Sequence, residues 1–141
     1  MNFIPDKPFL DTNILVYAKL RDENSIDKSN SAINLIKKIN THPVTSVQVL
    51  NEFSSVLIKH NVSDQIIKDT VQELIDNSVV IAISLEMIRE TWRIRDKYHF
   101  SYWDSMIVAA AIKGRCNILY TEDLQHGQVI DNRLEIFNPF L

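Results

Sequence analysis

The sequence has few of the residues that mark several common kinds of functional site. It contains one cysteine, Cys116, and two glycines, Gly114 and Gly127, in 141 residues. A lone cysteine forms neither an intramolecular disulfide nor a zinc–thiolate cluster, so nothing indicates an oxidising compartment. Two isolated glycines do not build a loop that cradles a phosphate. We expect Gly114 at a helix C-cap and Gly127 in a left-handed turn.

Long hydrophobic runs and an excess of basic charge are also missing. The longest apolar stretch, around Met106 to Ile112, is far too short to span a bilayer, and the N-terminal segment lacks the features of a leader. We therefore expect a cytoplasmic protein that does not enter a membrane. The formal net charge is -3, so binding to a nucleic acid would need local basic patches or a bound metal.

What is present is the composition of an ordinary globular protein. Hydrophobic residues make up 45% of the sequence and charged residues 23%, and there is no repeat and no low-complexity tract. A chain of this length buries a sizeable core without disulfides. We therefore expect a single domain that spans residues 1–141.

Hydrophobic periodicity predicts strands that alternate with helices. The helices are expected at residues 27–40, 47–57, 63–77, 85–97 and 102–112. About five strands are expected, one ending at Asp11 and the others at residues 42–46, 78–84, 117–121 and 134–137. The alternation predicts an α/β fold of three layers, α/β/α, around a mostly parallel sheet.

Two finer predictions follow from the same patterns. The run at residues 78–84 is continuous and β-branched, which is typical of a strand buried on both faces. Thr45 and Gln48 have the spacing of a capping box at the start of the helix that follows the second strand.

Four acidic residues lie within or directly beside strongly apolar segments. They are Asp11, Glu52, Asp104 and Asp123. Asp11 ends the first predicted strand and Asp123 follows the strand at 117–121, so both belong at the carboxyl ends of strands, where open α/β sheets bind ligands. Carboxylates drawn together repel one another unless a cation compensates, and Mg²⁺ or Mn²⁺ prefers such oxygen ligands.

Each acid also has a purely structural explanation. Asp11 is a good N-cap for the helix that follows it, and Asp104 completes a capping-box pattern with Ser101. Glu52 lies at the border of an apolar helical face, and Asp123 is typical of a turn. Only the four acids together indicate a metal site.

In this order and context the acids resemble those of the PIN-domain family of metal-dependent ribonucleases, and of its bacterial VapC-type toxins in particular. The resemblance covers nearly the whole chain and rests on the segments LDTNILVY, NEF, YWDSMIVAAA, YTEDLQHGQ and LEIFNPF. It implies a PIN-like fold with metal-binding and catalytic residues Asp11, Glu52, Asp104 and Asp123.

The same resemblance implies supporting polar roles for Thr12, Asn13 and Thr121. Glu122 and Asp131 remain alternative acids that would complete the cluster. The implied activity is hydrolysis of RNA by a metal-activated water, with Mg²⁺ or Mn²⁺ as cofactor and no covalent intermediate. The implied partners are the RNA substrate, a cognate antitoxin and a second copy of the chain, as in the toxin of a type II toxin–antitoxin pair.

Three other functions fit parts of the pattern. A phosphotransferase with Asp11 as nucleophile would need a second aspartate two positions on, where the chain has Asn13. A receiver-like signalling domain would need Lys113 as its late lysine, and this residue belongs to a predicted helix. A catalytically silent RNA-binding domain would use the acids only as helix caps.

Basic and aromatic side chains outside the acids are further candidates for contact with RNA. Arg89, Arg93 and Lys97 recur at intervals of four, although Glu86 and Glu90 favour an ordinary ion-paired surface instead. Aromatic side chains stack on unpaired bases, but core packing is their more frequent role. The aromatic candidates are Tyr17, Trp92, Tyr102 and Trp103.

Overall fold

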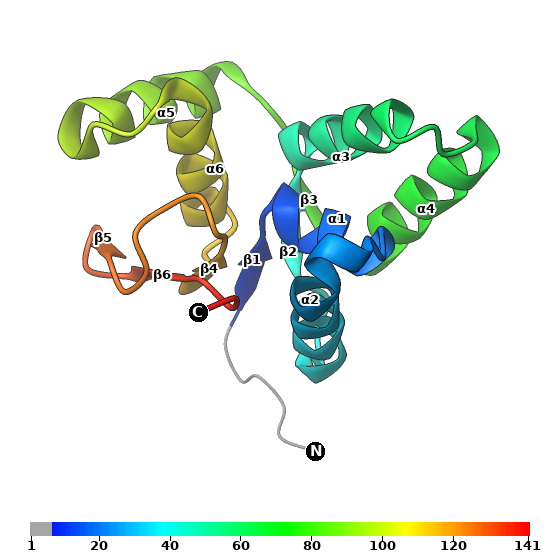
Figure 1. Cartoon of the computed structure of the whole chain (residues 1–141). Coiled ribbons are helices and arrows are strands. Elements are labelled where there is room, and N and C mark those ends of the chain that lie inside the picture. Colours follow the sequence, from blue (N-terminus) through cyan, green and yellow to red (C-terminus); the bar gives the residue numbers. More distant parts are fainter. Residues whose placement is uncertain (1–6) are drawn as a thin grey trace.

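The computed structural model describes residues 7–141, which form one six-stranded sheet with helices on both of its faces (Figure 1). The strands are β1 (Pro8–Leu10), β2 (Val44–Ser46), β3 (Val79–Ile81), β4 (Ile118–Tyr120), β5 (Val129–Ile130) and β6 (Leu134–Phe137). The helices are α1 (Thr12–Lys19), the 3-10 turn η1 (Glu23–Ser25), α2 (Ile26–Lys38), α3 (Val47–Lys59), α4 (Asp64–Asn77), α5 (Leu85–Tyr98) and α6 (Tyr102–Lys113).

The strand order is β3-β2-β1-β4-β6-β5, and every pair is parallel except β5 with β6. The chain first moves from β1 outward to β3 and then returns to the centre at β4. Because crossovers between parallel strands are right-handed, this reversal puts α1 to α4 on one face and α5 and α6 on the other, as Figure 1 shows. The predicted three-layer α/β/α fold with a mostly parallel sheet is confirmed.

The strands at the centre of the sheet are buried on both faces, and so is the helix α6. Phe9, Val44, Leu119 and Ile136 are fully buried, which explains the continuous apolar runs in the strands that carry them. In α6 every residue from 105 to 111 is buried. Among residues 7–141 none of the helices has the length and the apolar run that crossing a bilayer requires.

The sheet differs from the prediction at its two edges. β3 is an edge strand, and Val79 is 44% exposed, so the expectation that this run is buried on both faces is wrong. At the opposite edge, β5 adds a sixth strand that was not predicted, because two residues are too few to show a periodic pattern. β5 joins β6 through Asp131 and Asn132, which have positive φ angles of 52° and 56°.

The helix starts and the glycines show which local patterns were decisive. Ser46, not Thr45, caps α3, because its Oγ accepts a hydrogen bond from the Val49 amide at 3.3 Å. The predicted capping box is therefore wrong, because the residue three positions after Ser46 is Val49, whose side chain cannot return a hydrogen bond. Gly127 has φ 86°, as predicted for a left-handed turn, and Gly114 caps α6, where an added Cβ would lie 2.7 Å from Val44 Cγ1.

A cluster of charges ties the β5–β6 turn to α5. Asp131 accepts hydrogen bonds from Arg93 at 2.6 Å, from Lys97 at 3.0 Å and from the Tyr98 hydroxyl at 3.0 Å. The Arg93 guanidinium, above all, holds the pKa of the Asp131 carboxyl well below its usual range. Arg93 also pairs with Glu90, so the ion-paired explanation of this basic stripe is confirmed at Arg93.

We predict that Asp131→Asn lowers the free energy of unfolding at pH 7 by about 1 kcal/mol, because the surrounding cations are partly exposed. The folded-state pKa of Asp131 is below its unfolded value, so this stabilisation is complete above about pH 4 and shrinks as the pH falls further. Urea unfolding between pH 7 and pH 3 measures it. Glu90→Gln, which affects only Arg93, is the control and should cost less. Equal stabilities of wild type and Asp131→Asn at pH 7 would contradict the prediction.

Candidate active site

Asp11 and Thr121 lie opposite each other at the carboxyl ends of the two central strands. Leu10 of β1 pairs with Tyr120 of β4, and the Asp11 amide continues this pairing with a hydrogen bond of 3.1 Å to the Tyr120 carbonyl. The Thr121 hydroxyl then donates to Asp11 Oδ2 at 2.8 Å, across 110 positions of sequence. The parallel register therefore builds the first contact of the site, and both residues are buried.

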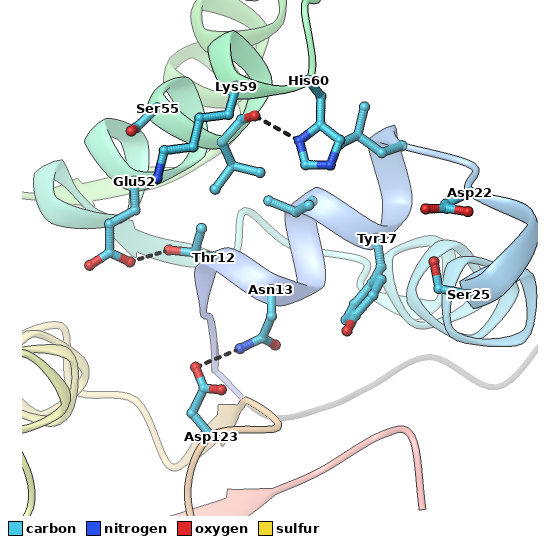
Figure 2. Close-up of a pocket in the computed structure, with 13 residues that line it drawn as sticks. Thr12, Asn13, Tyr17, Asp22, Ser25, Glu52, Ser55, Lys59, His60 and Asp123 are labelled. Carbon is cyan, nitrogen blue, oxygen red and sulfur yellow. Dashed lines mark hydrogen bonds between the residues drawn. The ribbon is translucent and has the colours of Figure 1, made fainter.

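Asp123 joins Asp11 through two polar neighbours. Its backbone amide donates to Thr121 Oγ1 at 3.1 Å, and its Oδ2 accepts from Asn13 Nδ2 at 3.1 Å, the bond drawn in Figure 2. Asn13 lies in the first turn of α1, and its amide also reaches Thr121 Oγ1 at 3.4 Å. Asn13 and Thr121, two of the predicted supporting residues, thus link the first acid to the fourth.

Glu52 reaches the same place from α3. Its Oε2 accepts a hydrogen bond of 2.7 Å from the Thr12 hydroxyl, and its Oε1 accepts one of 2.9 Å from Gln48 Nε2. The Thr12 amide donates in turn to Asp11 Oδ1 at 2.7 Å. Thr12, the third predicted supporting residue, therefore contacts two acids at once. Figure 2 shows Thr12 between Glu52 and the start of α1.

Asp104 is related to the other acids through its charge, which raises the pKa of Asp123, and through the first turn of α6, which contacts α3. Its amide donates to Ser101 Oγ at 3.1 Å, so the predicted cap of α6 is present. Gln48 Nε2 also donates to the Trp103 carbonyl at 3.2 Å, which joins α3 to the first turn of α6. The sequence patterns did not mark Gln48 as a site residue. It precedes Glu52 by one helical turn, however, and side chains at this spacing contact each other.

The acids disfavour one another's ionisation. Burial raises the pKa of Asp11 to about 7, and the charges of Asp123 and Glu52 add to this effect, while the hydrogen bonds from Thr121 and Thr12 oppose it. Desolvation, followed by the charge of Asp104, raises the pKa of Asp123. The charges of the neighbouring acids thus raise the pKa of Asp11 and of Asp123, and a site of this kind attracts a cation.

The oxygen atoms at this site are of the types that bind hard divalent cations. They are carboxylate, hydroxyl and amide oxygens, which Mg²⁺ and Mn²⁺ prefer. Across residues 7–141, no three Asp, Glu, His or Cys side chains are arranged so that they could hold a metal ion together. Mg²⁺ keeps several waters and needs only one or two carboxylates, and Asn13 Oδ1, buried without a partner in the described chain, is available to such a water.

The alternative acids have other partners. Glu122 lies 2.8 Å from the Lys28 ammonium and accepts a hydrogen bond of 2.7 Å from the Tyr17 hydroxyl. Asp131 is tied to α5, as described above. Asp123 is therefore the late acid that contacts the Asn13–Thr121 pair, and neither Glu122 nor Asp131 takes that place.

The residues needed by two of the other functions also have different roles. Asn13 acts as a donor to Asp123, and it replaces the second aspartate that the phosphotransferase mechanism requires. Lys113 lies in the last turn of α6, at the opposite end from Asp104, and its ammonium is 3.7 Å from Glu86. The lysine of a receiver-like site is therefore not at the acids.

Two of the four acids border a cleft of about 600 Å³ (Figure 2). Glu52 and Asp123 line it together with residues of α1 and with the last turns of α3. The cleft lies at the carboxyl ends of β1 and β4. The connections that follow these two strands lead to opposite sides of the sheet, and open α/β sheets bind ligands at such a switch point. The fold and the site together define an α/β domain with an acidic cleft at its topological switch point.

A family model described as the PIN domain matches residues 9–131, and the chain belongs to this family. The family resemblance drawn from the sequence is thereby confirmed. No curated protein matches the sequence.

Solved structures with the same fold include three toxin or toxin–antitoxin structures. A toxin–antitoxin complex from Klebsiella pneumoniae matches at TM-score 0.71 and 19% identity, over 94% of this chain and 97% of that one. The sarcin–ricin loop cleaving toxin VapC20 of Mycobacterium tuberculosis matches at 0.66 and 16%, over 82% and 91%. VapBC2 from Rickettsia felis, bound to a promoter DNA fragment, matches at 0.56 and 23%, over 93% and 98%.

We predict that acid stabilises the metal-free protein through Asp11. Its folded-state pKa of about 7 exceeds the unfolded value, so between about pH 4 and pH 7 the folded protein holds a proton that the unfolded chain releases. The melting temperature in EDTA should therefore be higher at pH 5.5 than at pH 8, by about 5 °C. Circular dichroism measures this difference.

Asp11→Asn should melt at a higher temperature than wild type at pH 8 and should lose most of the pH dependence. Asp96→Asn, which alters an exposed acid of α5, is the matched control and should keep the wild-type profile. An unchanged pH profile in Asp11→Asn would show that other groups cause the dependence.

Proposed function

We propose that the protein is a divalent-metal-dependent endoribonuclease. The observation that carries this proposal is the linked set of buried or cleft-facing acids at the switch point of a PIN fold. In this proposal the metal-binding and catalytic residues are Asp11, Glu52, Asp104 and Asp123. A single nuclease domain over residues 1–141 and a location in the cytoplasm are parts of the same proposal.

The chain's own residues would hold and orient the reacting groups. Mg²⁺ or Mn²⁺, when bound, supplies a water of lowered pKa and a positive charge near the scissile phosphate. Asp11 and Asp123 would hold the ion, and Thr121 and Asn13 fix the orientation of these carboxylates. Glu52 is held by two hydrogen bonds and faces the cleft, where its carboxylate would be placed to accept a proton from a water molecule.

The biological role we propose is that of the toxin in a type II toxin–antitoxin pair, with RNA as its substrate. Support comes from the fold, which the chain shares with VapBC complexes and with a toxin–antitoxin complex. A cognate antitoxin would inhibit the enzyme by covering the acids with a basic side chain such as arginine, which pairs with carboxylates through two parallel hydrogen bonds.

A homodimer is supported by an apolar stripe on α5. Leu85, Ile88 and Trp92 recur at intervals of three and four residues, so they share one face of the helix. They are 73%, 36% and 51% exposed. Trp92 packs against Tyr102 on one side, but a stripe of large apolar side chains that remains this exposed is typical of a contact surface.

We predict that wild-type protein cleaves RNA with Mg²⁺ or Mn²⁺ and not with EDTA. Asp104→Asn should reduce kcat by about 100-fold or more, because one charge of the metal site is lost. Ser101 still caps α6 in this variant, so the fold should be retained. The assay is cleavage of a mixed pool of single-stranded RNAs and tRNAs, resolved by gel electrophoresis.

Asp96→Asn is again the control and should cut like wild type. Labelled phosphate should not remain on the protein, because no covalent intermediate is proposed. Full activity of Asp104→Asn together with a lower stability would limit Asp104 to the favourable interaction of its charge with the N-terminus of α6.

We predict that Trp92→Glu converts a dimer into a monomer, because a charge would be buried in the apolar stripe. Light scattering coupled to size-exclusion chromatography measures the mass. Ile66→Glu alters a side chain of α4 that is 48% exposed, and it should leave the dimer intact. A monomeric wild type, or a variant that still dimerises, would show that the stripe is not the dimer contact.

A further inference from the structure

RNA is a polyanion, and the proposed site repels it. The chain carries a net charge of -3, and four carboxylates gather where the scissile phosphate would lie. Besides the proposed metal ion, a cationic side chain beside these acids would help to hold the strand. Three basic side chains outside the cleft are already paired: Lys28 with Glu122, and Arg93 and Lys97 with Asp131.

Lys59 is different. Among the residues described, Lys59 and His60 are the basic side chains that line the cleft beside Glu52 and Asp123. No hydrogen bond or ion pair within residues 7–141 engages the Lys59 ammonium, whereas His60 Nδ1 lies 2.9 Å from the Val56 carbonyl. Lys59 is therefore a free positive charge in the cleft.

The position of Lys59 on α3 relates it to the acids. Glu52, Ser55, Val56 and Lys59 are spaced by three and four residues, so they lie on one face of the helix. Glu52 and Lys59 are seven residues apart, which is about 10 Å along the helix axis. Figure 2 shows the Lys59 side chain extended back along α3 towards Glu52, and this exposed lysine lines the cleft.

We propose that Lys59 binds a backbone phosphate of the RNA strand next to the scissile one. This inference rests on the proposed function, and it makes the cleft beside α3 the path of the strand. The apolar side chains of Val16, Leu20 and Val56 line the same cleft and would contact sugars and bases, which need no charge. Lysine suits this role because it binds phosphate as a point charge and does not read the base sequence.

A purely structural explanation makes a different prediction. Lys59 lies in the last turn of α3, where a cation stabilises the helix dipole. Loss of that interaction would lower stability but would leave the salt dependence of RNA cleavage unchanged. The salt dependence therefore separates the two roles.

The test measures kcat and KM for an RNA that wild type cuts, chosen from a pool of single-stranded oligoribonucleotides and tRNAs, over a series of KCl concentrations. Lys59→Gln should raise KM by about 5-fold with kcat almost unchanged. The slope of log(kcat/KM) against log[KCl] should become shallower by about 0.7, the value for one phosphate contact on a single strand. Lys59→Arg should restore both quantities.

Lys68→Gln is the matched control, because Lys68 is exposed on α4 and does not line the cleft. It should behave like wild type. A wild-type KM and salt slope in Lys59→Gln would overturn the inference and leave the nuclease assignment standing, including when the variant is less stable. Normal kinetics combined with lost inhibition by an antitoxin would assign the cleft to a protein partner. A wild type that cuts no RNA with metal would refute the proposed function, and the inference with it.

Discussion

The parallel pairing of β1 with β4 is the contact on which the site depends. It sets Asp11 opposite Thr121, and a slip of one residue would turn one of these side chains to the other face of the sheet. The pairing also marks the switch point. From β1 the chain runs to β2 and β3 at one edge of the sheet, and it then returns across the opposite face to β4. The remaining parts of the site are arranged around it: α1 starts directly after β1, and the turn with Asp123 follows β4.

Neutral donors hold the acids in place without removing their charge. Thr121 and Thr12 donate to Asp11, and Asn13 donates to Asp123. Such bonds orient a carboxylate and lower its pKa a little, but at Asp11 they do not offset burial, and the pKa remains near 7. A lysine or arginine in the same place would have neutralised the acids and left nothing to attract a metal ion. The choice of threonine and asparagine thus keeps the site both ordered and negative.

The sequence predicted the layers of the fold because hydrophobic periodicity reports burial directly. It failed where burial depends on neighbours that the local pattern does not contain. The run around Val79 looks like a central strand, yet it forms an edge, because no further strand within residues 7–141 pairs beside it. The sequence proposed the four acids as a group, but the choice between Asp123 and Glu122 needed coordinates, since Lys28 is 94 positions away from the glutamate that it binds. Capping at Ser46 instead of Thr45 shows that a pattern of residue types leaves a boundary uncertain by one position.

The charged residues divide into two groups that sequence alone does not separate. Asp131 and Glu122 are bound to lysine or arginine, and these pairs attach the turns after β4 and β5 to helices of the two outer layers. Asp11, Asp123 and Glu52 are bound to neutral groups, and Lys59 is bound to none within the described chain. Ionic stabilisation is therefore concentrated outside the cleft, while uncompensated charges of both signs remain inside it. With this separation, salt and metal ions act on the site without weakening the neutral hydrogen bonds and the strand pairing that hold its shape.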